Sequence, residues 1–208
     1  VPETKPAVAN AENQDDFLYQ VLEDGTMEIT GYQGKENEGL IIPDRINGIQ
    51  VTKIGPGAFQ SRSGLSGSLK LPEGLTEIGA FAFTDCSGMR GSLELPGRLT
   101  KIGNDAFRNC SGLSGSLELP EGLTELGSCA FKDCVQLSGS LELPNGLREI
   151  ENSAFEGCIG LDGSLKLPES LTKIGDSAFL NCGSVSGCLE LPEGLTEIEG
   201  RAFEDCSS

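Results

Sequence analysis

The stretch Gly67-Ser-Leu-Lys-Leu-Pro-Glu-Gly-Leu-Thr-Glu-Ile-Gly79, closed by Ala82-Phe83 and Cys86, decides the fold because the chain repeats it at a constant interval. Its proline, its first glycine and its phenylalanine each recur every 24 residues. The phenylalanine series is Phe59, Phe83, Phe107, Phe131, Phe155, Phe179 and Phe203. A fixed period of this length is typical of a solenoid, in which each unit buries its apolar face only against its neighbours.

The apolar spacing within one unit predicts two short extended segments joined at a corner. Leu69 and Leu71 alternate with polar residues, which is the period-two pattern of a strand with one buried face. Pro72 lacks an N–H and fixes φ, so it favours a corner over the inside of a sheet. We expect Leu75–Ile78 to form the second extended segment. Residues 79–85 are too few for a full helix, and we expect a helical or 3₁₀ turn there.

Glycine and cysteine also form columns at the repeat period. The glycine of the Gly67 column recurs without exception, which predicts a turn with positive φ or a close approach between neighbouring units. One cysteine column holds Cys86, Cys110, Cys134, Cys158, Cys182 and Cys206. Because this phase faces inward and a straight ladder of thiols does not converge on one zinc ion, we expect reduced, buried core residues with weak S–H bonds to the backbone. Cys129 and Cys188 lie at other phases, and we expect Cys129 to be exposed and to react first.

The organisation along the chain follows from where the repeat begins. Residues 1–16 contain prolines and acidic residues but almost no large apolar side chain, so we expect a disordered leader or linker. Residues 17–208 are expected to form one solenoid domain. Within it, residues 17–39 form an N-terminal hairpin cap around Asp24-Gly25, and residues 40–208 are the repeats. No cap sequence follows the last repeat, and we expect the natural chain to continue past it; the alternative is that the last turn serves as a minimal cap.

Composition narrows the function. The net charge of −17 disfavours nucleic acid and anionic lipid and favours cationic partners or metal ions, although an acidic surface also serves plain solubility. No apolar run is long enough to cross a membrane, so no membrane insertion is expected. Histidine is absent, which removes the commonest general base and most zinc geometries. We therefore expect no enzyme activity, no cofactor and no bound structural metal.

The repeat pattern Leu-x-Leu-Pro-x-x-Leu-Thr-x-Ile-Gly-x-x-Ala-Phe-x-x-Cys resembles the BspA-like leucine-rich repeat family. The cap resembles that family's opening through Asp24-Gly-Thr, Ile29-Thr-Gly-Tyr32, Ile42-Pro, Ile46-Asn-Gly and Val51-Thr-Lys-Ile-Gly55. The match covers roughly residues 17 to 206, and the Gly-Ser pair of each unit lengthens the repeat slightly over the commoner form. The resemblance implies a β-rich α/β solenoid, specifically a right-handed leucine-rich-repeat superhelix, on the outside of a bacterial cell. It also implies adhesion to host proteins, other bacteria or matrix, but supplies no binding residues.

Outward-facing columns offer a candidate recognition surface. Three stacked glutamates, bracketed by Lys70 and Lys166, form an acidic strip that must repel itself unless a partner offsets the charge. Glu125 and Glu149 extend the strip around the corner, and Arg148 replaces the threonine of the other repeats at its edge. The candidate partner-binding residues are Glu94, Glu118, Glu142, Ser92, Ser116, Ser140 and Arg148. A basic partner or a weakly bound divalent cation fits such a strip, while the alternative is a solvated face without a ligand.

The leading functional prediction is a secreted or cell-surface bacterial module for recognition or adhesion. It would bind protein or glycan on host or neighbouring cells through a repeated solenoid face. The alternative is a rigid spacer that displays another domain and has no ligand of its own. A spacer is expected to have no ligand-sized concavity and no interrupted surface column, whereas a binder is expected to show a patch where the columns depart from the repeat.

Overall fold

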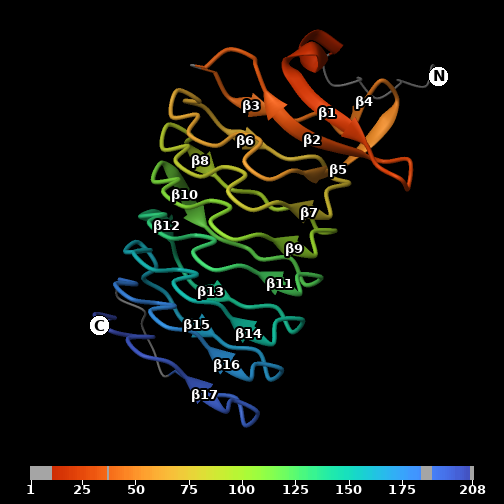
Figure 1. The fold of residues 1–208 in the computed structure, drawn as a ribbon. Helices are drawn as coiled ribbons and strands as arrows, with labels where there is room; N and C mark the ends of the chain where they lie inside the picture. Colours follow the sequence, from red (N-terminus) through yellow and green to blue (C-terminus); the bar gives the residue numbers. More distant parts are fainter. Residues whose placement is uncertain (1–10, 37, 184–188, 207–208) are drawn as a thin grey trace, which may run out of the picture.

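The computed structural model describes residues 11–36, 38–183 and 189–206. Over these residues the chain forms a solenoid of stacked coils, with the N-terminal strands and the last coil at opposite ends of the stack (Figure 1). We number the coils 1 to 7 by the phenylalanine that each contributes, from Phe59 to Phe203. The predicted solenoid is confirmed, and it is almost entirely β: the one helix among the described residues is the 3₁₀-helix η1 (Ala11–Asp16).

A hairpin covers the N-terminal end of the stack, as predicted. Strands β1 (Phe17–Val21) and β2 (Met27–Tyr32) pair antiparallel, and Gly25 takes φ of +78° in the turn between them. β2 then pairs parallel with β5 (Ile49–Ile54), which belongs to coil 1 and also pairs with β4 (Arg45–Ile46). The hairpin is therefore continuous with the sheet of the repeats.

The expected leader is only partly within the described residues. Residues 1–10 lie outside them, and the remaining part is η1. The carbonyl of Asp16 accepts the N–H of Gln33 at 2.8 Å, and the side chain of Gln33 donates to the carbonyl of Asp15 at 2.9 Å. The end of η1 is thus bonded to the cap, while the division of the chain at residue 16 stays a prediction.

Two strand lines run along the stack, one before and one after the corner proline. The first strand line comprises β3 (Leu40–Ile41), β6 (Leu69–Lys70), β8 (Gly91–Ser92), β10 (Leu113–Ser116), β12 (Gln136–Ser138), β13 (Leu141–Glu142) and β15 (Leu165–Lys166). The second strand line comprises β5, β7 (Glu77–Ile78), β9 (Lys101–Ile102), β11 (Glu125–Leu126), β14 (Glu149–Ile150), β16 (Lys173–Ile174) and β17 (Glu197–Ile198). All pairings between coils are parallel.

The two strand lines differ in regularity. On the second line a seven-stranded sheet runs from the cap to β11, and a separate sheet joins β14, β16 and β17. The first line is divided into the pairs β3–β6 and β13–β15 and the group β8, β10 and β12. In that group the partners are offset by two residues from the repeat period, since Gly91 lies opposite Leu113 and Ser116 opposite Ser138.

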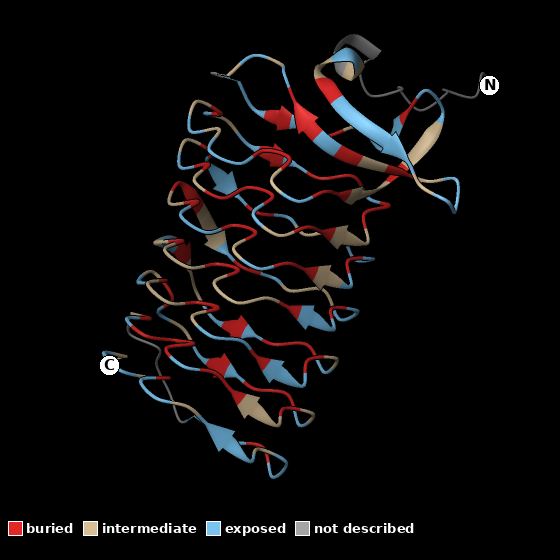
Figure 2. Ribbon diagram, viewed as in Figure 1, coloured by how far each residue is buried: buried red, intermediate tan, exposed pale blue. Residues whose placement is uncertain are grey.

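The core repeats in every coil, and buried residues return at the same positions (Figure 2). The predicted phenylalanine column is confirmed: successive rings from Phe59 to Phe203 stack with interplanar angles of 3° to 8°. Their centroids are 5.0 Å apart between Phe59 and Phe83 and 5.7 Å apart between Phe131 and Phe155. The stack therefore follows the coil spacing of a parallel β-structure, about 4.8 Å, with one wider step.

One predicted core position is wrong. Leu189, expected to continue the buried leucine line of Leu69 to Leu165, is 38% exposed. Leu191 and Ile198 of the same coil are also exposed. Coil 7 has a described neighbour on one side only, so its apolar residues lack the second coil that buries their counterparts in the middle of the stack.

The expected helical turn at residues 79–85 does not form. Phe81 and Asp85 take φ of +61°, in the left-handed region, and this interrupts a right-handed helix. The amide groups of Phe81, Phe83 and Asp85 instead donate to carbonyls of the next coil, at 2.8 to 2.9 Å. Every second N–H group of this segment therefore forms a hydrogen bond to the next coil. The segment is a series of tight turns that joins adjacent coils.

The glycine column of Gly67 was predicted to provide either a turn with positive φ or a close approach between coils, and both occur. Gly91, Gly115 and Gly139 take positive φ of 80° to 88°. At Gly67 the reason is close approach, because a Cβ atom there would lie 2.5 Å from the amide nitrogen of Gly39 in the preceding coil. Different coils therefore need glycine at this position for different reasons.

The column cysteines are free and lie against the phenylalanine stack, as predicted. Each thiol donates to the carbonyl of the phenylalanine one coil earlier, for example Cys86 to Phe59 at 3.0 Å and Cys158 to Phe131 at 3.1 Å. Cys206, in the last coil, is the half-buried member of the column. Burial raises the pKa of the Cys86 thiol to about 12 and that of Cys134 well above its usual value.

These thiols are therefore expected to be unreactive in the folded protein. Near pH 8 only about one part in ten thousand of a thiol with a pKa of about 12 is thiolate, the reactive form. Cys129 was predicted to be exposed, but it is half-buried, and burial raises the pKa of its thiol. Because it is less buried than Cys86 and Cys134, it should still be labelled before them. Timed alkylation of a Cys188→Ser variant, read by peptide mass spectrometry, checks this order. Labelling of the column before Cys129, or a mass loss from disulfides, would contradict it.

Candidate recognition surface

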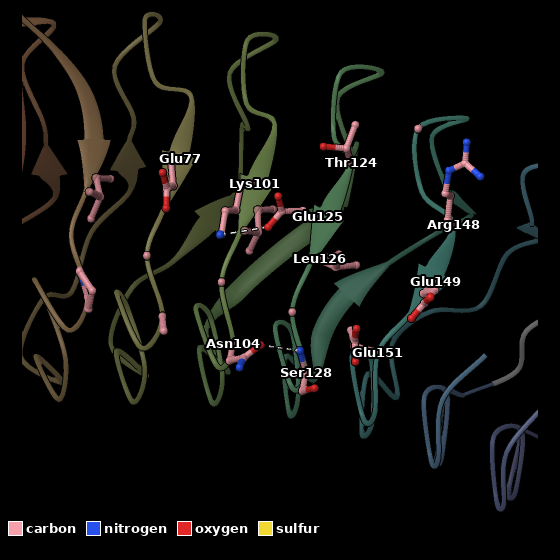
Figure 3. Close-up of a pocket in the computed structure, with 18 of the residues that line it drawn as sticks. Glu77, Lys101, Asn104, Thr124, Glu125, Leu126, Ser128, Arg148, Glu149 and Glu151 are labelled. Atoms are coloured by element: carbon pink, nitrogen blue, oxygen red, sulfur yellow. Dashed lines mark hydrogen bonds and ion pairs between the residues drawn. The ribbon is translucent and has the colours of Figure 1, made fainter. Parts of the chain in front are cut away.

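A large groove lies over the second strand line. It has a volume of about 960 Å³ and is lined by residues from the cap and coils 1 to 5. The residues that matter for its chemistry are Lys101, Thr124, Glu125, Arg148, Glu149 and Glu151. Figure 3 shows them projecting from β9, β11, β14 and the adjoining turns. We call this the sheet groove.

Coils 1 to 4 form a regular ladder beneath the sheet groove. The N–H of Gly103 donates to the carbonyl of Ile78 at 2.8 Å, and that of Gly127 to Ile102 at 2.9 Å. A threonine column adds a side-chain bond at each step: the hydroxyl of Thr100 donates to the carbonyl of Thr76 at 3.1 Å. Both series resume in coils 6 and 7, where Thr172 donates to the carbonyl of Arg148 at 3.0 Å.

The ladder breaks between coils 4 and 5. The sheet that ends at β11 and the sheet that starts at β14 are separate, so no described strand bridges them. Three departures from the repeat meet at this boundary: Arg148 stands in the threonine column, Glu151 in the column of Gly103 and Gly127, and Glu149 follows Glu125 at the lysine-or-glutamate position. On the opposite side the coils stay joined, since the N–H of Phe131 donates to the carbonyl of Ala154 at 2.8 Å. We call this boundary the ladder break.

The replacement of glycine by Glu151 does not by itself explain the ladder break. In coil 7, Glu199 occupies the same column, yet its N–H donates to the carbonyl of Ile174 at 2.9 Å and β16 pairs with β17. The two boundaries differ in the threonine column, where Arg148 stands at the ladder break and Thr196 in coil 7, and in the charge of the facing residues. Lys173 lies opposite Glu197 in the paired case, whereas Glu125 precedes Glu149 at the ladder break. Like charges on adjacent strands destabilise the pairing.

Elsewhere on the second line, neighbouring coils carry opposite charges. The ammonium of Lys53 lies 2.8 Å from Glu77, and that of Lys101 lies 3.0 Å from Glu125. Hydrogen bonding to these carboxylates raises the pKa of Lys53 and of Lys101. Lys173 pairs with Glu199 at 2.6 Å and with Glu197 at 3.6 Å, and the bond to Glu199 raises its pKa. Each of these lysines therefore forms its ion pairs with the coil that follows it in the sequence.

The structure divides the residues that the sequence grouped into one strip. Glu94, Glu118, Ser92 and Ser116 line a groove of about 340 Å³ on the first strand line, and Ser92 and Glu94 also line a neighbouring groove of about 470 Å³. Glu142 pairs with Lys166 in the next coil, and the hydroxyl of Ser164 donates to that of Ser140 at 3.2 Å. Arg148 is not part of this groove and lines the sheet groove instead. All three glutamates are exposed, as expected, but Glu94 and Glu118 lie outside the strands and are not register partners in a ladder.

Sequence reasoning singled out Arg148 but missed Glu151. The signal was present, because Glu151 breaks a column that is glycine at Gly55, Gly79, Gly103, Gly127 and Gly175. In those coils a Cβ atom would lie close to the backbone of the preceding coil, for example 2.6 Å from the nitrogen of Ala80 at Gly103. Glu151 departs from the repeat at such a contact and lines the sheet groove.

Two further observations limit the chemistry of the surface. In the described ranges, no group of three or more cysteine, aspartate or glutamate side chains is arranged to hold a metal ion. Nor does any helix in those ranges have the length and apolar character needed to cross a bilayer. The lining of the sheet groove presents carboxylate, ammonium, guanidinium and hydroxyl groups, which suit polar and charged ligand groups.

The stacked coils, the 24-residue repeat and the parallel strand pairing make the chain a β-solenoid repeat protein of the leucine-rich-repeat class. The family profile for the BspA type leucine rich repeat region matches residues 33–158 and 138–208. The chain belongs to this family, a family of repeat proteins that generally serve in protein interaction.

Solved structures agree with this assignment. A leucine rich cell surface protein from Faecalibacterium prausnitzii is 28% identical with a TM-score of 0.81, and the match covers 98% of this chain and 53% of that protein. The Leucine Rich Repeat protein of T. pallidum is 32% identical with a TM-score of 0.63 over 81% of this chain and 87% of that protein. The chain thus spans about half the length of the F. prausnitzii protein. Among curated proteins, none matches the chain.

Proposed function

We propose that this chain is an extracellular recognition module that binds a protein or glycan partner through the sheet groove. The observation that carries the proposal is that this large groove coincides with the ladder break. A spacer needs only regular coils. Here Arg148, Glu149 and Glu151 interrupt three columns at one boundary, at the expense of backbone hydrogen bonds. Such a local loss of stability is typical of functional sites.

A bacterial cell-surface location and an adhesive role belong to the same proposal. Their support is the family and the cell-surface description of the F. prausnitzii protein. The rigid stack holds the groove in one shape, which reduces the entropy lost on binding. The net charge of −17 favours partners with basic surfaces and speeds their encounter. The absence of histidine and the repeated chemistry of the coils favour binding over catalysis.

The first strand line is a second candidate surface, because Glu94 and Glu118 line a groove of their own. We propose it as the less favoured site, since that groove is about a third as large and Glu142 is neutralised by Lys166. A Glu94/Glu118/Glu142→Gln variant separates the two surfaces. It should leave binding to the sheet groove unchanged within about twofold.

Thr124→Arg tests the proposed site directly, with Thr196→Arg as its matched control. Both threonines are exposed and occupy the same column, but only Thr124 lines the sheet groove. We expect Thr124→Arg to weaken binding at least roughly tenfold, because it adds a long side chain to the groove lining, while Thr196→Arg has little effect. The probes are purified extracellular-matrix proteins and glycans, measured by biolayer interferometry at physiological salt. Equal effects of the two variants would move the site elsewhere, and no binding to any probe would favour the spacer.

A further inference from the structure

On the second strand line, lysine and glutamate alternate from coil to coil, except at one boundary where two glutamates follow each other. The register places Lys53 opposite Glu77, Glu77 opposite Lys101, and Lys101 opposite Glu125. Beyond the ladder break it places Glu149 opposite Lys173 and Lys173 opposite Glu197. The alternation is regular within coils 1 to 4 and within coils 5 to 7. At the ladder break between them, both neighbouring positions are glutamates, Glu125 and Glu149. One positive charge is therefore missing between coil 4 and coil 5.

No described residue supplies the missing charge. Lys101 already pairs with Glu125, and Lys173 turns to Glu197 and Glu199 on its other side. Arg148 makes no salt bridge in the part of the chain that the structure describes, and Figure 3 shows its guanidinium directed away from the carboxylate of Glu149. Glu149 is thus left without an ion-pair partner there, at the edge of β14 that β11 does not pair.

The same place is where the coils are least tightly joined. The rings of Phe131 and Phe155 are 5.7 Å apart, against 5.0 to 5.4 Å elsewhere in the stack. The sheet groove, with Glu125, Glu149 and Glu151 in its lining, lies over this step. A cationic side chain entering the groove would meet exposed carboxylates from two adjacent coils at once, and such charge complementarity favours a basic partner.

We propose that the partner bound in the sheet groove is a protein that inserts a lysine or arginine side chain between Glu125 and Glu149. This proposal rests on the proposed function and specifies its ligand chemistry. The inserted cation takes the place that the alternation leaves empty, and Glu151 lies beside it in the lining. A basic group is favoured over a glycan because the fault is one of charge. A change within the line does not repair it: Glu149→Lys would set two lysines opposite each other at Lys173.

The test uses a 12-residue peptide of alternating lysine and serine, with a peptide of the same sequence carrying acetylated lysines as its control. Alternate side chains of an extended peptide point to one side, so several lysines can reach the groove at once. We expect the lysine peptide to bind the full chain, and its affinity to fall as salt rises, because exposed charges are screened beyond about 8 Å at physiological ionic strength. The acetylated peptide should not bind measurably.

Glu149→Lys and Glu197→Lys separate the site from general attraction to an acidic protein. The two variants change the net charge equally and lie on the same strand line, but Glu197 is outside the sheet groove. We expect Glu149→Lys to weaken peptide binding roughly tenfold or more, as removal of one partner of a close charge pair does. Glu197→Lys should stay within about twofold of the unchanged protein. Circular dichroism melting confirms that both variants fold.

Each other outcome decides against part of the account. Equal losses in the two variants would show attraction by net charge alone and overturn the inserted cation. An unchanged affinity in Glu149→Lys would do the same. If Thr124→Arg blocks protein partners while Glu149→Lys does not affect the peptide, the groove is the binding site but its ligand is not recognised through a basic side chain. If neither variant affects any partner, the proposed function itself fails.

Discussion

Replacing Phe131 by alanine is expected to lower the free energy of unfolding by about 3–5 kcal/mol. The ring is fully buried and stacks between Phe107 at 5.3 Å and Phe155 at 5.7 Å. Its removal opens a cavity bordered by two coils, and it takes away the surface against which Cys158 and the neighbouring rings pack. Because each coil contacts only its neighbours, no contact elsewhere in the stack compensates for packing lost at a central coil.

Urea unfolding of the variant, followed by circular dichroism, measures this effect. Phe81→Ala is the matched control, since Phe81 is the phenylalanine outside the column within the repeats and is 42% exposed. It should change stability by less than about 1 kcal/mol, or raise it slightly, because alanine is no worse in the left-handed backbone that Phe81 adopts. A loss of less than 1 kcal/mol in Phe131→Ala would contradict the shared core.

Gly103→Ala is expected to lower the free energy of unfolding by about 1–3 kcal/mol, since the added methyl group meets backbone and not a movable side chain. Its Cβ would lie 2.6 Å from the nitrogen of Ala80 and 2.8 Å from the carbonyl carbon of Gly79. The neighbouring coils would have to separate, and the bond from the Gly103 N–H to the carbonyl of Ile78 would weaken.

Gly97→Ala provides the comparison within the same coil. A Cβ atom at Gly97 would meet no atom within 4 Å, so the change should be neutral or stabilise by up to about 1 kcal/mol through the unfolded chain. Hydrogen exchange should show faster exchange of the Gly103 amide in Gly103→Ala and no such change in Gly97→Ala. Equal stability of the two variants would mean that the coils separate without loss and that glycine is not required by their contact.

Much of the fold was predictable because the repeat multiplies each local signal. A single leucine or cysteine says little, but a column at a fixed period identifies its phase as buried, as with Cys86 and Phe83. The Asp24-Gly25 hairpin was equally clear from turn chemistry. What failed was local backbone shape. The residue types at Phe81 and Asp85 do not predict a left-handed φ. This backbone conformation accompanies hydrogen bonds from their N–H groups to carbonyls of the next coil.

The candidate site was harder to predict, for a physical reason. Charge columns read from the sequence assume that every coil pairs with the next in the same register. That assumption holds for Lys101 and Glu125, but not for Glu94 and Glu118, which lie beside the offset pairing of β8 and β10. The ladder break depends on contacts across two coils and on which carboxylate already has a partner. Only the three-dimensional arrangement shows that, among the glutamates of the second strand line, Glu149 has no ion pair in the described residues.

The measurement that most directly tests the central claim is the ratio of the dissociation constants of Thr124→Arg and Thr196→Arg for one partner. The variants place the same side chain in the same column, inside and outside the sheet groove. If the groove over the ladder break is the recognition surface, Thr124→Arg should bind at least roughly tenfold more weakly than Thr196→Arg. A ratio near one, with both variants folded, would contradict the account.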